Sequence, residues 1–394
     1  MDLRLADRMA QLGTETAFEV LARARALERQ GKTIIHLEIG EPDFDTPEHI
    51  KEAAIKALRD GATHYTPAAG LLEAREAIAE HVEGTRKVAV HPDEVVITPG
   101  SKPIMFFTIL ALVNPGDEVI YPNPGYPIYE SVTRFAGGVP RPLVLREERG
   151  FRIDPDELRQ LASSRTRLIV LNSPHNPCGS ALTREDLTAI AEVAQRTGAY
   201  VLADEIYWQI MYDTPHHSIL SLPGMKERTI LLDGFSKAYA MTGWRLGFGV
   251  MPRALAPRIA QLMVNSNSCA AAFTQLAGIA ALRGPRAPVE AMVAEFRRRR
   301  DVIVRGLNAI EGITCTVPVG AFYAFPNTRR IDPQSKPLAD YLLNEAGVAC
   351  LSGTAFGDAG QGYLRFSYAN SVENITEGLR RMAEALRRYR APVG

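Results

Sequence analysis

Lys237 is the residue of this sequence whose surroundings point most directly to chemistry. It follows an apolar run at residues 230–232, lies next to Ser236, and precedes Arg245 by eight positions. Because burying an ammonium group is costly, a lysine at the end of a buried strand is favoured only if its amine can lose its proton or become covalently occupied. A neutral amine is what a Schiff base requires, and a hydroxyl with an arginine suits a phosphate. The chain has eight lysines and 37 arginines, so we interpret Lys237 as a functional amine.

The segments that must position Lys237 alternate between strand-like and helix-like patterns. Short apolar runs bounded by Gly, Pro, Asn or Asp predict strands, and amphipathic segments such as residues 184–197 predict helices between them. This alternation favours an α/β fold, with a mostly parallel sheet covered by helices on both faces. The predicted strands are residues 95–98, 118–121, 168–172, 200–203, 229–233 and 246–250.

Polar residues follow five of these predicted strands. Because ligands of open α/β sheets bind outside the carboxyl ends of the strands, we expect these residues to share one site. After the first strand, a glycine loop opens a helix, where backbone N–H groups and the helix dipole favour a phosphate. Together the strand ends supply phosphate ligands, an aromatic ring, an amide, a carboxylate, a phenol and an amine, which are the groups that pyridoxal phosphate (PLP) needs. The residues are Gly100, Ser101, Lys102, Tyr126, Asn176, Asp204, Tyr207, Ser236 and Lys237.

A break at residues 284–288, GPRAP, divides the chain. A long amphipathic helix is predicted after it, followed by short strands and helices to about residue 390. The basic run 297–300 is expected on a solvated face of that helix, because no second basic cluster accompanies it. We therefore expect a large PLP-binding domain at residues 48–285 and a small C-terminal domain at residues 286–394, with residues 1–47 packing against the small domain.

The composition argues against several classes of protein. The formal net charge is zero, so there is no electrostatic case for nucleic acid or an anionic membrane as a partner. There is no signal pattern and no apolar run long enough to span a bilayer. Four widely spaced cysteines indicate reduced thiols of a cytoplasmic protein, and the absence of HExxH spacing argues against a metal site.

The motifs taken together resemble those of fold-type I PLP enzymes of the class I/II aminotransferase family, in the branch with bacterial aspartate and aromatic aminotransferases. The similarity runs from LEIGEPDFDTP (37–47) through NSPHNPCG, ADEIY and GFSKAYAMTGWRLG to YLRFSYA (363–369). It implies a mostly parallel seven-stranded sheet sandwiched by helices, plus a smaller α+β domain. It also implies a PLP-dependent aminotransferase that moves the amino group of an L-amino acid (aspartate, aromatic or a broad range) to a 2-oxo acid such as 2-oxoglutarate, by a ping-pong mechanism.

The resemblance also implies roles around the cofactor ring. Lys237 would form the internal aldimine and then shuttle the proton, and Asp204 would pair with the pyridine nitrogen. Tyr207 and Asn176 would bind the ring oxygen, and Tyr126 would stack on the ring. The phosphate would be held by Gly100, Ser101, Lys102, Ser236 and Arg245, with Lys102 acting through its backbone.

Further roles concern the substrate and the subunits. Arg365 would bind the substrate α-carboxylate, assisted by Asn176 and the backbone of Gly40. Tyr65 would cross to the neighbouring subunit's phosphate, which implies a homodimer with shared active sites. The places to look for contacts with the substrate side chain are residues 9–18, Ile39, Tyr65, Asn267 and Tyr323.

The loop before Arg365 departs from the family pattern. The family usually has Pro-Gly-x-x-Phe-Gly, whereas this chain has Ser352 in place of the proline. Unlike proline, serine does not fix the backbone φ angle, so the sequence leaves the rigidity of this loop open.

Three other functions compete with transamination. A β-lyase, decarboxylase or cyclising lyase would use the same cofactor and fold, and the motifs hardly separate these reactions. A regulator with an aminotransferase-like sensor would need an added DNA-binding domain. A nicotinamide dehydrogenase is disfavoured, because the segment 247–249, GFG, lacks the third glycine of the dinucleotide fingerprint and does not open a helix.

Overall fold

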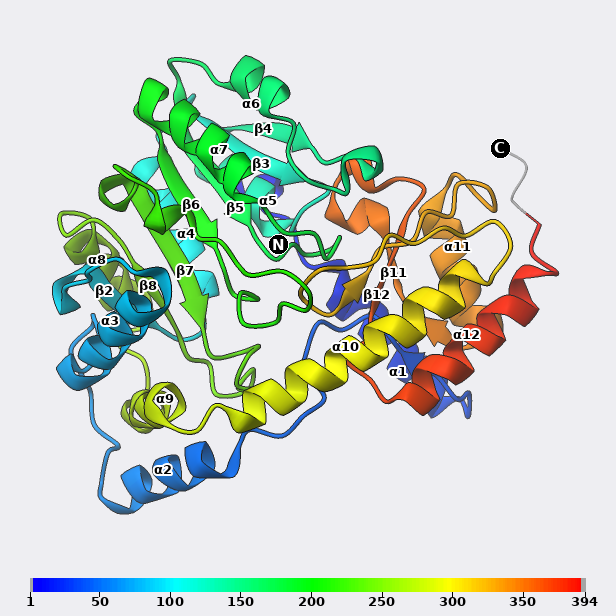
Figure 1. The fold of residues 1–394 in the computed structure, drawn as a ribbon, viewed down its shortest axis with the longest axis horizontal. Helices are drawn as coiled ribbons and strands as arrows, with labels where there is room; N and C mark the ends of the chain where they lie inside the picture. Colours follow the sequence, from blue (N-terminus) through cyan, green and yellow to red (C-terminus); the bar gives the residue numbers. More distant parts are fainter. Residues whose placement is uncertain (1–2, 391–394) are drawn as a thin grey trace.

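A seven-stranded sheet forms the centre of the computed structural model, which describes residues 3–390 (Figure 1). The strand order is β2-β8-β7-β6-β5-β3-β4. β8 runs antiparallel to β2 and β7, and all other neighbours are parallel. This confirms the predicted mostly parallel sheet. The strands are β2 (Val95–Thr98), β3 (Glu118–Asn123), β4 (Val139–Val144), β5 (Thr166–Asn172), β6 (Tyr200–Asp204), β7 (Thr229–Gly234) and β8 (Gly247–Val250).

The central strands are apolar on both faces because helices cover both faces. In β5, Leu168 and Val170 belong to one core cluster, whereas Ile169 and Leu171 belong to another on the opposite face. Side chains alternate between the two faces of a strand, so this is the pattern expected of a doubly covered sheet. α4 (Lys102–Leu112), α5 (Ile128–Phe135) and α8 (Ala256–Ser266) cover the first face. The other face is covered by α2 (Glu48–Arg59), α3 (Leu72–Arg86), α6 (Pro155–Leu161), α7 (Arg184–Thr197) and α9 (Ala272–Arg283).

The edge strand β4 is absent from the sequence-based list of strands. It contains Pro140 and Pro142, which cannot donate hydrogen bonds to a ladder and are therefore tolerated at a sheet edge. β4 pairs only with β3, and most of its residues are not buried. The two prolines made this edge strand unrecognisable from the sequence pattern. β4 completes the seven strands that the family resemblance implies.

A second core joins the two ends of the chain. β1 (Ile35–His36) pairs in parallel with β10 (Val348–Ala349), and β11 (Leu351–Ser352), β12 (Leu364–Ser367) and β9 (Tyr323–Ala324) form an antiparallel sheet. Ile35 and Leu37 share one apolar cluster with residues of the C-terminal helices. These helices are α10 (Ala287–Asn308), α11 (Ser335–Tyr341) and α12 (Val372–Leu386), and a π-helical turn, η6 (Leu342–Ala346), follows α11.

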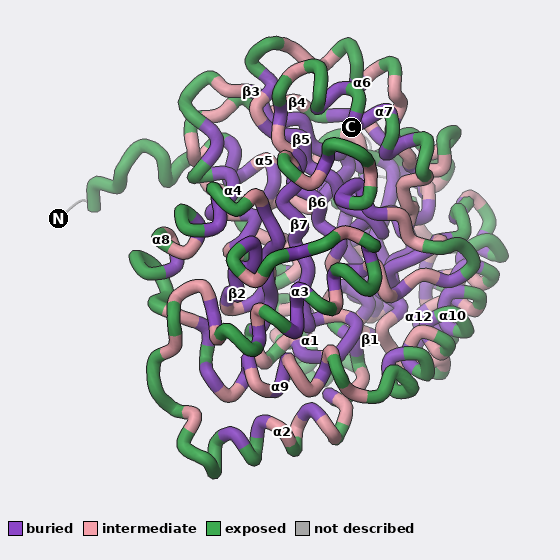
Figure 2. Tube along the Cα trace, turned by 60° about the vertical axis from the view of Figure 1, so that its left-hand side comes forward, coloured by how far each residue is buried: buried purple, intermediate pink, exposed green. Residues whose placement is uncertain are grey.

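The first described residues extend away from this body as an exposed segment (Figure 2). It contains a short 3₁₀ turn, η1 (Asp7–Gln11), without buried residues, and leads into α1 (Thr16–Arg29). The remaining 3₁₀ turns are η2 (Pro92–Glu94), η3 (Glu147–Arg149), η4 (Ile219–Ser221), η5 (Lys226–Arg228), η7 (Gly353–Phe356) and η8 (Asp358–Gly360).

The basic run of α10 is only half solvated, so that expectation was partly wrong. Arg299 and Arg300 are buried. Arg299 Nη1 donates to Asp43 at 2.6 Å, and Arg300 Nη1 donates to Asp213 at 2.5 Å. These partners lie far away in the sequence, so helical periodicity gave no sign of them. Between residues 3 and 390, no helix has the length and apolar character needed to cross a bilayer.

Candidate active site

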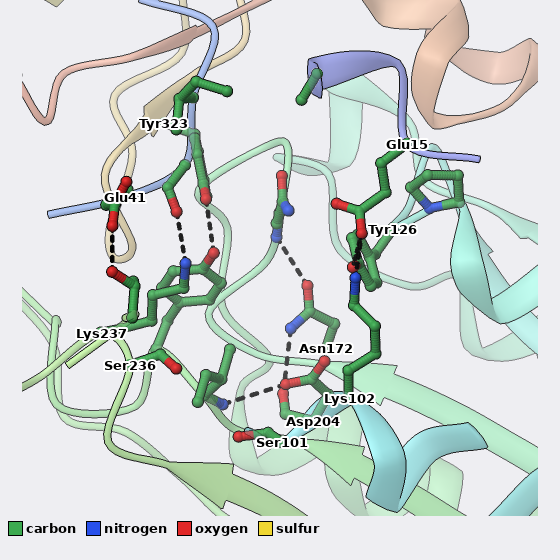
Figure 3. Close-up of a pocket in the computed structure, with 18 of the residues that line it drawn as sticks. Glu15, Glu41, Ser101, Lys102, Tyr126, Asn172, Asp204, Ser236, Lys237 and Tyr323 are labelled. Atoms are coloured by element: carbon green, nitrogen blue, oxygen red, sulfur yellow. Dashed lines mark hydrogen bonds and ion pairs between the residues drawn. The ribbon is translucent and has the colours of Figure 1, made fainter. Parts of the chain in front are cut away.

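A cavity of about 570 Å³ lies at the carboxyl ends of β5, β6 and β7 (Figure 3). Cavities of this size hold small-molecule ligands and cofactors. The sheet supplies one wall, while Tyr323 of β9 and Arg365 of β12 come from the second core. All of the sequence-predicted site residues line the cavity except Gly100 and Tyr65: Gly40, Ser101, Lys102, Tyr126, Asn176, Asp204, Tyr207, Ser236, Lys237, Arg245 and Arg365.

Lys237 projects into the cavity from the turn that follows β7. Its Nζ donates a hydrogen bond to the backbone oxygen of Gly40 at 2.5 Å. Burial lowers the pKa of Lys237 from 10.5 to about 8, although the nearby Glu41 acts to raise it. A substantial fraction of the amine is therefore neutral near physiological pH, as a nucleophile or general base requires.

Asp204 is the last residue of β6 and is buried at the floor of the cavity. Its Oδ2 accepts a hydrogen bond from the Tyr129 hydroxyl at 2.6 Å, and its Oδ1 accepts one from the Ile206 N–H at 3.2 Å. Burial raises the pKa of Asp204 to about 6, against the opposing effect of the Tyr129 hydrogen bond. A buried carboxylate of this kind is stabilised by a cationic partner, such as a protonated ring nitrogen.

The start of α4 and the guanidinium of Arg245 form a cradle for an anion. Ser101 precedes α4 without capping it, so the first N–H groups of the helix lack a side-chain partner from that residue. A Cβ atom on Gly100 would lie 2.2 Å from Arg245 Nη2, so only glycine lets the arginine lie against this loop. Arg245 itself has a positive φ of 54°, a strained conformation that is typical of functional sites. Helix N–H groups, a hydroxyl and a guanidinium together suit a phosphate.

Arg365 is a buried cation without an anionic partner among the described residues. Its Nη1 donates to Asn176 Oδ1 at 3.2 Å and its Nη2 donates to the backbone oxygen of Glu38, while its Nε has no partner. The guanidinium lies 4.5 Å from the centroid of the Tyr323 ring. A buried charge is costly when unpaired, so this group is suited to an incoming carboxylate.

A buried ion network supports the floor of the site behind Asp204. Arg86 Nη2 lies 2.9 Å from Glu205 and 3.2 Å from Asp233, and its guanidinium stacks 3.9 Å from the centroid of the Trp208 ring. Although burial opposes it, His216 and then Arg86 hold the pKa of Glu205 at about 2. Because Glu205 follows Asp204 directly, this network fixes the end of β6.

The sequence profile of the family described as "Aminotransferase class I and II" matches residues 32–382. The chain belongs to this aminotransferase family. Its members depend on PLP, and this enzyme is accordingly a PLP-dependent transaminase with a fold-type I architecture.

Relatives with two different substrate names are equally similar to this aminotransferase. An aspartate aminotransferase of Rhizobium meliloti is 38% identical over 401 residues, covering 98% of this chain and 97% of the relative. An aromatic-amino-acid aminotransferase of Thermococcus litoralis is 38% identical over 389 residues, covering 98% and 99%. The solved aspartate aminotransferase of Thermus thermophilus with maleate is 39% identical, with a TM-score of 0.94 over 98% of this chain and 100% of that structure. Similarity alone therefore does not select the amino acid.

The chemistry of the cavity fits PLP. The amine of Lys237, the buried carboxylate of Asp204 and the cradle beside Arg245 match the aldehyde, the ring nitrogen and the phosphate of the cofactor. The hydroxyl of Tyr207 faces that of Tyr323 at 2.6 Å. The Tyr126 hydroxyl instead donates to Glu15 at 2.8 Å, and its ring stays in the cavity wall.

Two predicted residues lie outside the cavity wall. Gly100 lies against the guanidinium of Arg245 and does not line the cavity. Tyr65 is 89% exposed and belongs to the surface of this single chain. The Lys102 side chain turns to the carboxylate of Glu15, so its amine is already paired there.

Ser352 has a backbone conformation that a proline could also adopt. Its φ is −58°, within the range that a proline ring imposes. Its hydroxyl accepts a hydrogen bond from the Thr354 N–H at 3.3 Å and lies 2.7 Å from the Thr354 hydroxyl, which caps the 3₁₀ turn η7. The side chain thus stabilises the turn that carries Phe356 into the cavity wall.

Sequence reasoning missed Glu41 and Thr242 as lining residues, and it did not single out Glu15 within the segment 9–18. The segment 9–18 was singled out for substrate contacts, and its last four residues do line the cavity. Ile39 and Tyr323 also line it, whereas Asn267 and Tyr65 do not. Glu41 follows the motif glycine Gly40 directly, so its position beside that motif was the available signal.

Proposed function

We propose that this enzyme transfers the amino group of an L-amino acid to a 2-oxo acid such as 2-oxoglutarate, in a ping-pong reaction. Aspartate, aromatic amino acids or a broad range are the candidate donors. The observation that carries the proposal is the placement of a neutralisable amine, Lys237, in one cavity with the guanidinium of Arg365, which has no anionic partner among residues 3–390. One group can attack or remove a proton, and the other can hold a carboxylate.

When bound, PLP supplies an aldehyde that captures amines and a ring that withdraws electrons from the substrate α-carbon. Lys237 would hold the cofactor by its amine in the resting enzyme. When free, the Lys237 amine would remove the proton from the substrate α-carbon and return it to the former aldehyde carbon of the cofactor. Asp204 would keep the ring nitrogen protonated, and Tyr207 with Asn176 would bind the ring oxygen.

The remaining assignments concern binding. Ser101, Ser236 and Arg245, with the backbone of Gly100 and Lys102, would hold the phosphate, and Tyr126 would stack on the ring. Arg365 would orient the substrate α-carboxylate with help from Asn176 and the backbone of Gly40. The contacts of Arg365 with Asn176 and of Lys237 with Gly40 support this grouping.

We also propose a homodimer with shared active sites, in which Tyr65 reaches the phosphate site of the neighbouring subunit. The 89% exposure of Tyr65 in a single chain supports this. The domain limits of residues 48–285 and 286–394, with residues 1–47 joining the smaller domain, also remain proposals, supported by the pairing of β1 with β10. A cytoplasmic location is proposed from the sequence, and the four cysteines are free thiols.

A half-reaction titration tests the function. The PLP-loaded protein is mixed with single L-amino acids without a 2-oxo acid, and the visible band of the lysine-bound cofactor is followed. A donor that converts this band to that of pyridoxamine phosphate, with 2-oxoglutarate restoring it, supports transamination. Ammonia, carbon dioxide or a cleaved side chain, with the original band regenerated, would instead support a lyase. K237A should abolish the conversion.

A further inference from the structure

The carboxylate of Glu15 faces the cavity instead of capping its own helix. Glu15 occupies the position before α1, where polar side chains usually accept hydrogen bonds from the helix N–H groups, but it makes no such bond. Its Oε1 accepts a hydrogen bond from the Tyr126 hydroxyl at 2.8 Å and another from Lys102 Nζ. Figure 3 shows Glu15 reaching down from the N-terminal segment to meet Tyr126 and Lys102 at one side of the cavity.

The Glu15–Lys102 ion pair involves a cation whose side chain has no role in the proposed function. In the part of the cavity wall formed by residues 3–390, the cations are Lys102, Lys237, Arg245 and Arg365. The proposed function assigns Lys237 to the cofactor aldehyde, Arg245 to its phosphate and Arg365 to the substrate α-carboxylate. Lys102 remains, and Glu15 neutralises its charge.

The cavity wall also presents apolar side chains beside Arg365. Ile39, Leu351 and Phe356 line the same cavity as Arg365, and the Phe356 ring centroid lies 5.0 Å from the Arg365 guanidinium. A second carboxylate brought into these surroundings would lose its water without gaining a free cation, which is costly. An uncharged side chain would instead gain from burial against apolar surface.

We infer that Glu15 is a specificity-determining residue, which directs the enzyme to amino acids with one carboxylate and an uncharged side chain by neutralising Lys102. This inference rests on the proposed function. Because the Glu15–Lys102 pair is neutral as a whole, it gives no advantage to a basic side chain either. Glu15 lies outside the family motifs that surround the cofactor, so those motifs do not report this selectivity.

The test compares L-phenylalanine with L-aspartate in the donor half-reaction, without any 2-oxo acid, in the wild-type protein, E15Q and E19Q. The wild type should convert phenylalanine with the higher kcat/KM. E15Q keeps an acceptor for Tyr126 but frees the charge of Lys102. Because the Lys102 side chain is 48% exposed, its charge is partly screened, and the aspartate-to-phenylalanine ratio should rise about fivefold. E19Q removes an equal charge from the first turn of the same helix, where the side chain is exposed, and should leave the ratio unchanged.

An unchanged ratio in E15Q, with the phenylalanine reaction retained, would overturn the inference, and so would a wild-type preference for aspartate. The wild-type preference serves as the deciding measurement if E15Q does not fold or load cofactor. A wild-type protein that converts no amino acid donor at all would instead contradict the proposed function itself, whatever the role of Glu15.

Discussion

The hydroxyls of Tyr207 and Tyr323 lie 2.6 Å apart inside the cavity. Tyr207 follows β6 of the large sheet, and Tyr323 lies on β9 of the second core, so this hydrogen bond joins the two halves of the site. The rings also meet edge to face, with centroids 5.6 Å apart. A shift of either ring therefore changes the position of the other.

Gly40 offers a way to displace Tyr323. A Cβ atom at position 40 would lie 2.2 Å from the Tyr323 hydroxyl, and this buried ring has little room to retreat. G40A should therefore lower kcat/KM by about 10²-fold, because small displacements of positioned groups are costly to catalysis. Steady-state kinetics checks this. The double variant G40A/Y323F removes the clashing oxygen and should recover part of the loss, whereas a fully active G40A would contradict the geometry.

Arg365 should be needed for binding the substrate rather than the cofactor. Lysine cannot form the paired hydrogen bonds of a guanidinium with a carboxylate. R365K should lower kcat/KM by about 10²-fold, on the order of 2–3 kcal/mol, mainly through KM. The cofactor band should remain. R329K changes an arginine that stacks on Tyr363 with a centroid distance of 4.5 Å outside the cavity, and should have little effect. An unaltered KM in R365K would exclude the assigned role.

The lowered pKa of Lys237 predicts the pH dependence of cofactor uptake. Only the neutral amine can attack an aldehyde. Because burial lowers the pKa from 10.5 to about 8, the neutral fraction grows as pH rises and is nearly complete above about pH 9. The rate of PLP uptake by the apo-protein, followed by visible absorbance, should rise through pH 8 and then level off. A rise that continues to about pH 10.5, the ordinary pKa of lysine, would contradict the burial effect.

The ion network behind Asp204 should contribute strongly to stability. R86M would leave the buried carboxylates of Glu205 and Asp233 without their arginine. Removing one partner of a buried ion pair costs about 3–5 kcal/mol, so urea unfolding should show a large loss of free energy. R134M breaks the exposed pair of Arg134 with Glu130 and should cost at most about 1 kcal/mol. Equal losses of unfolding free energy in R86M and R134M would show that burial does not determine how much an ion pair contributes to stability.

The sequence predicted which residues line the cavity better than it predicted the packing around the cavity. Residues such as Asp204 and Lys237 could be found because each follows an apolar strand, and the carboxyl ends of parallel strands meet at one edge. The strand β4 was hidden by Pro140 and Pro142, whose effect on pairing depends on whether the strand lies at an edge.

Contacts between distant segments could not be predicted. The burial of Arg299 depends on Asp43, 256 residues away. The position of Glu15 in the cavity depends on Lys102, the first residue of α4, and on Tyr126, which lies just before α5. No local periodicity reports such pairs, because they arise only when separate elements pack together.

The pairing of β1 with β10 has a consequence for the newly made chain. Chains fold as they leave the ribosome, amino end first, and the large sheet is complete once β8 has emerged. Ile35 and His36, made early, must nevertheless wait for Val348 and Ala349 before they gain a partner strand. Arg365 emerges later still. The groups assigned to the cofactor are thus made before Arg365, the residue assigned to the substrate α-carboxylate, so binding of that carboxylate is the last property that the growing chain acquires.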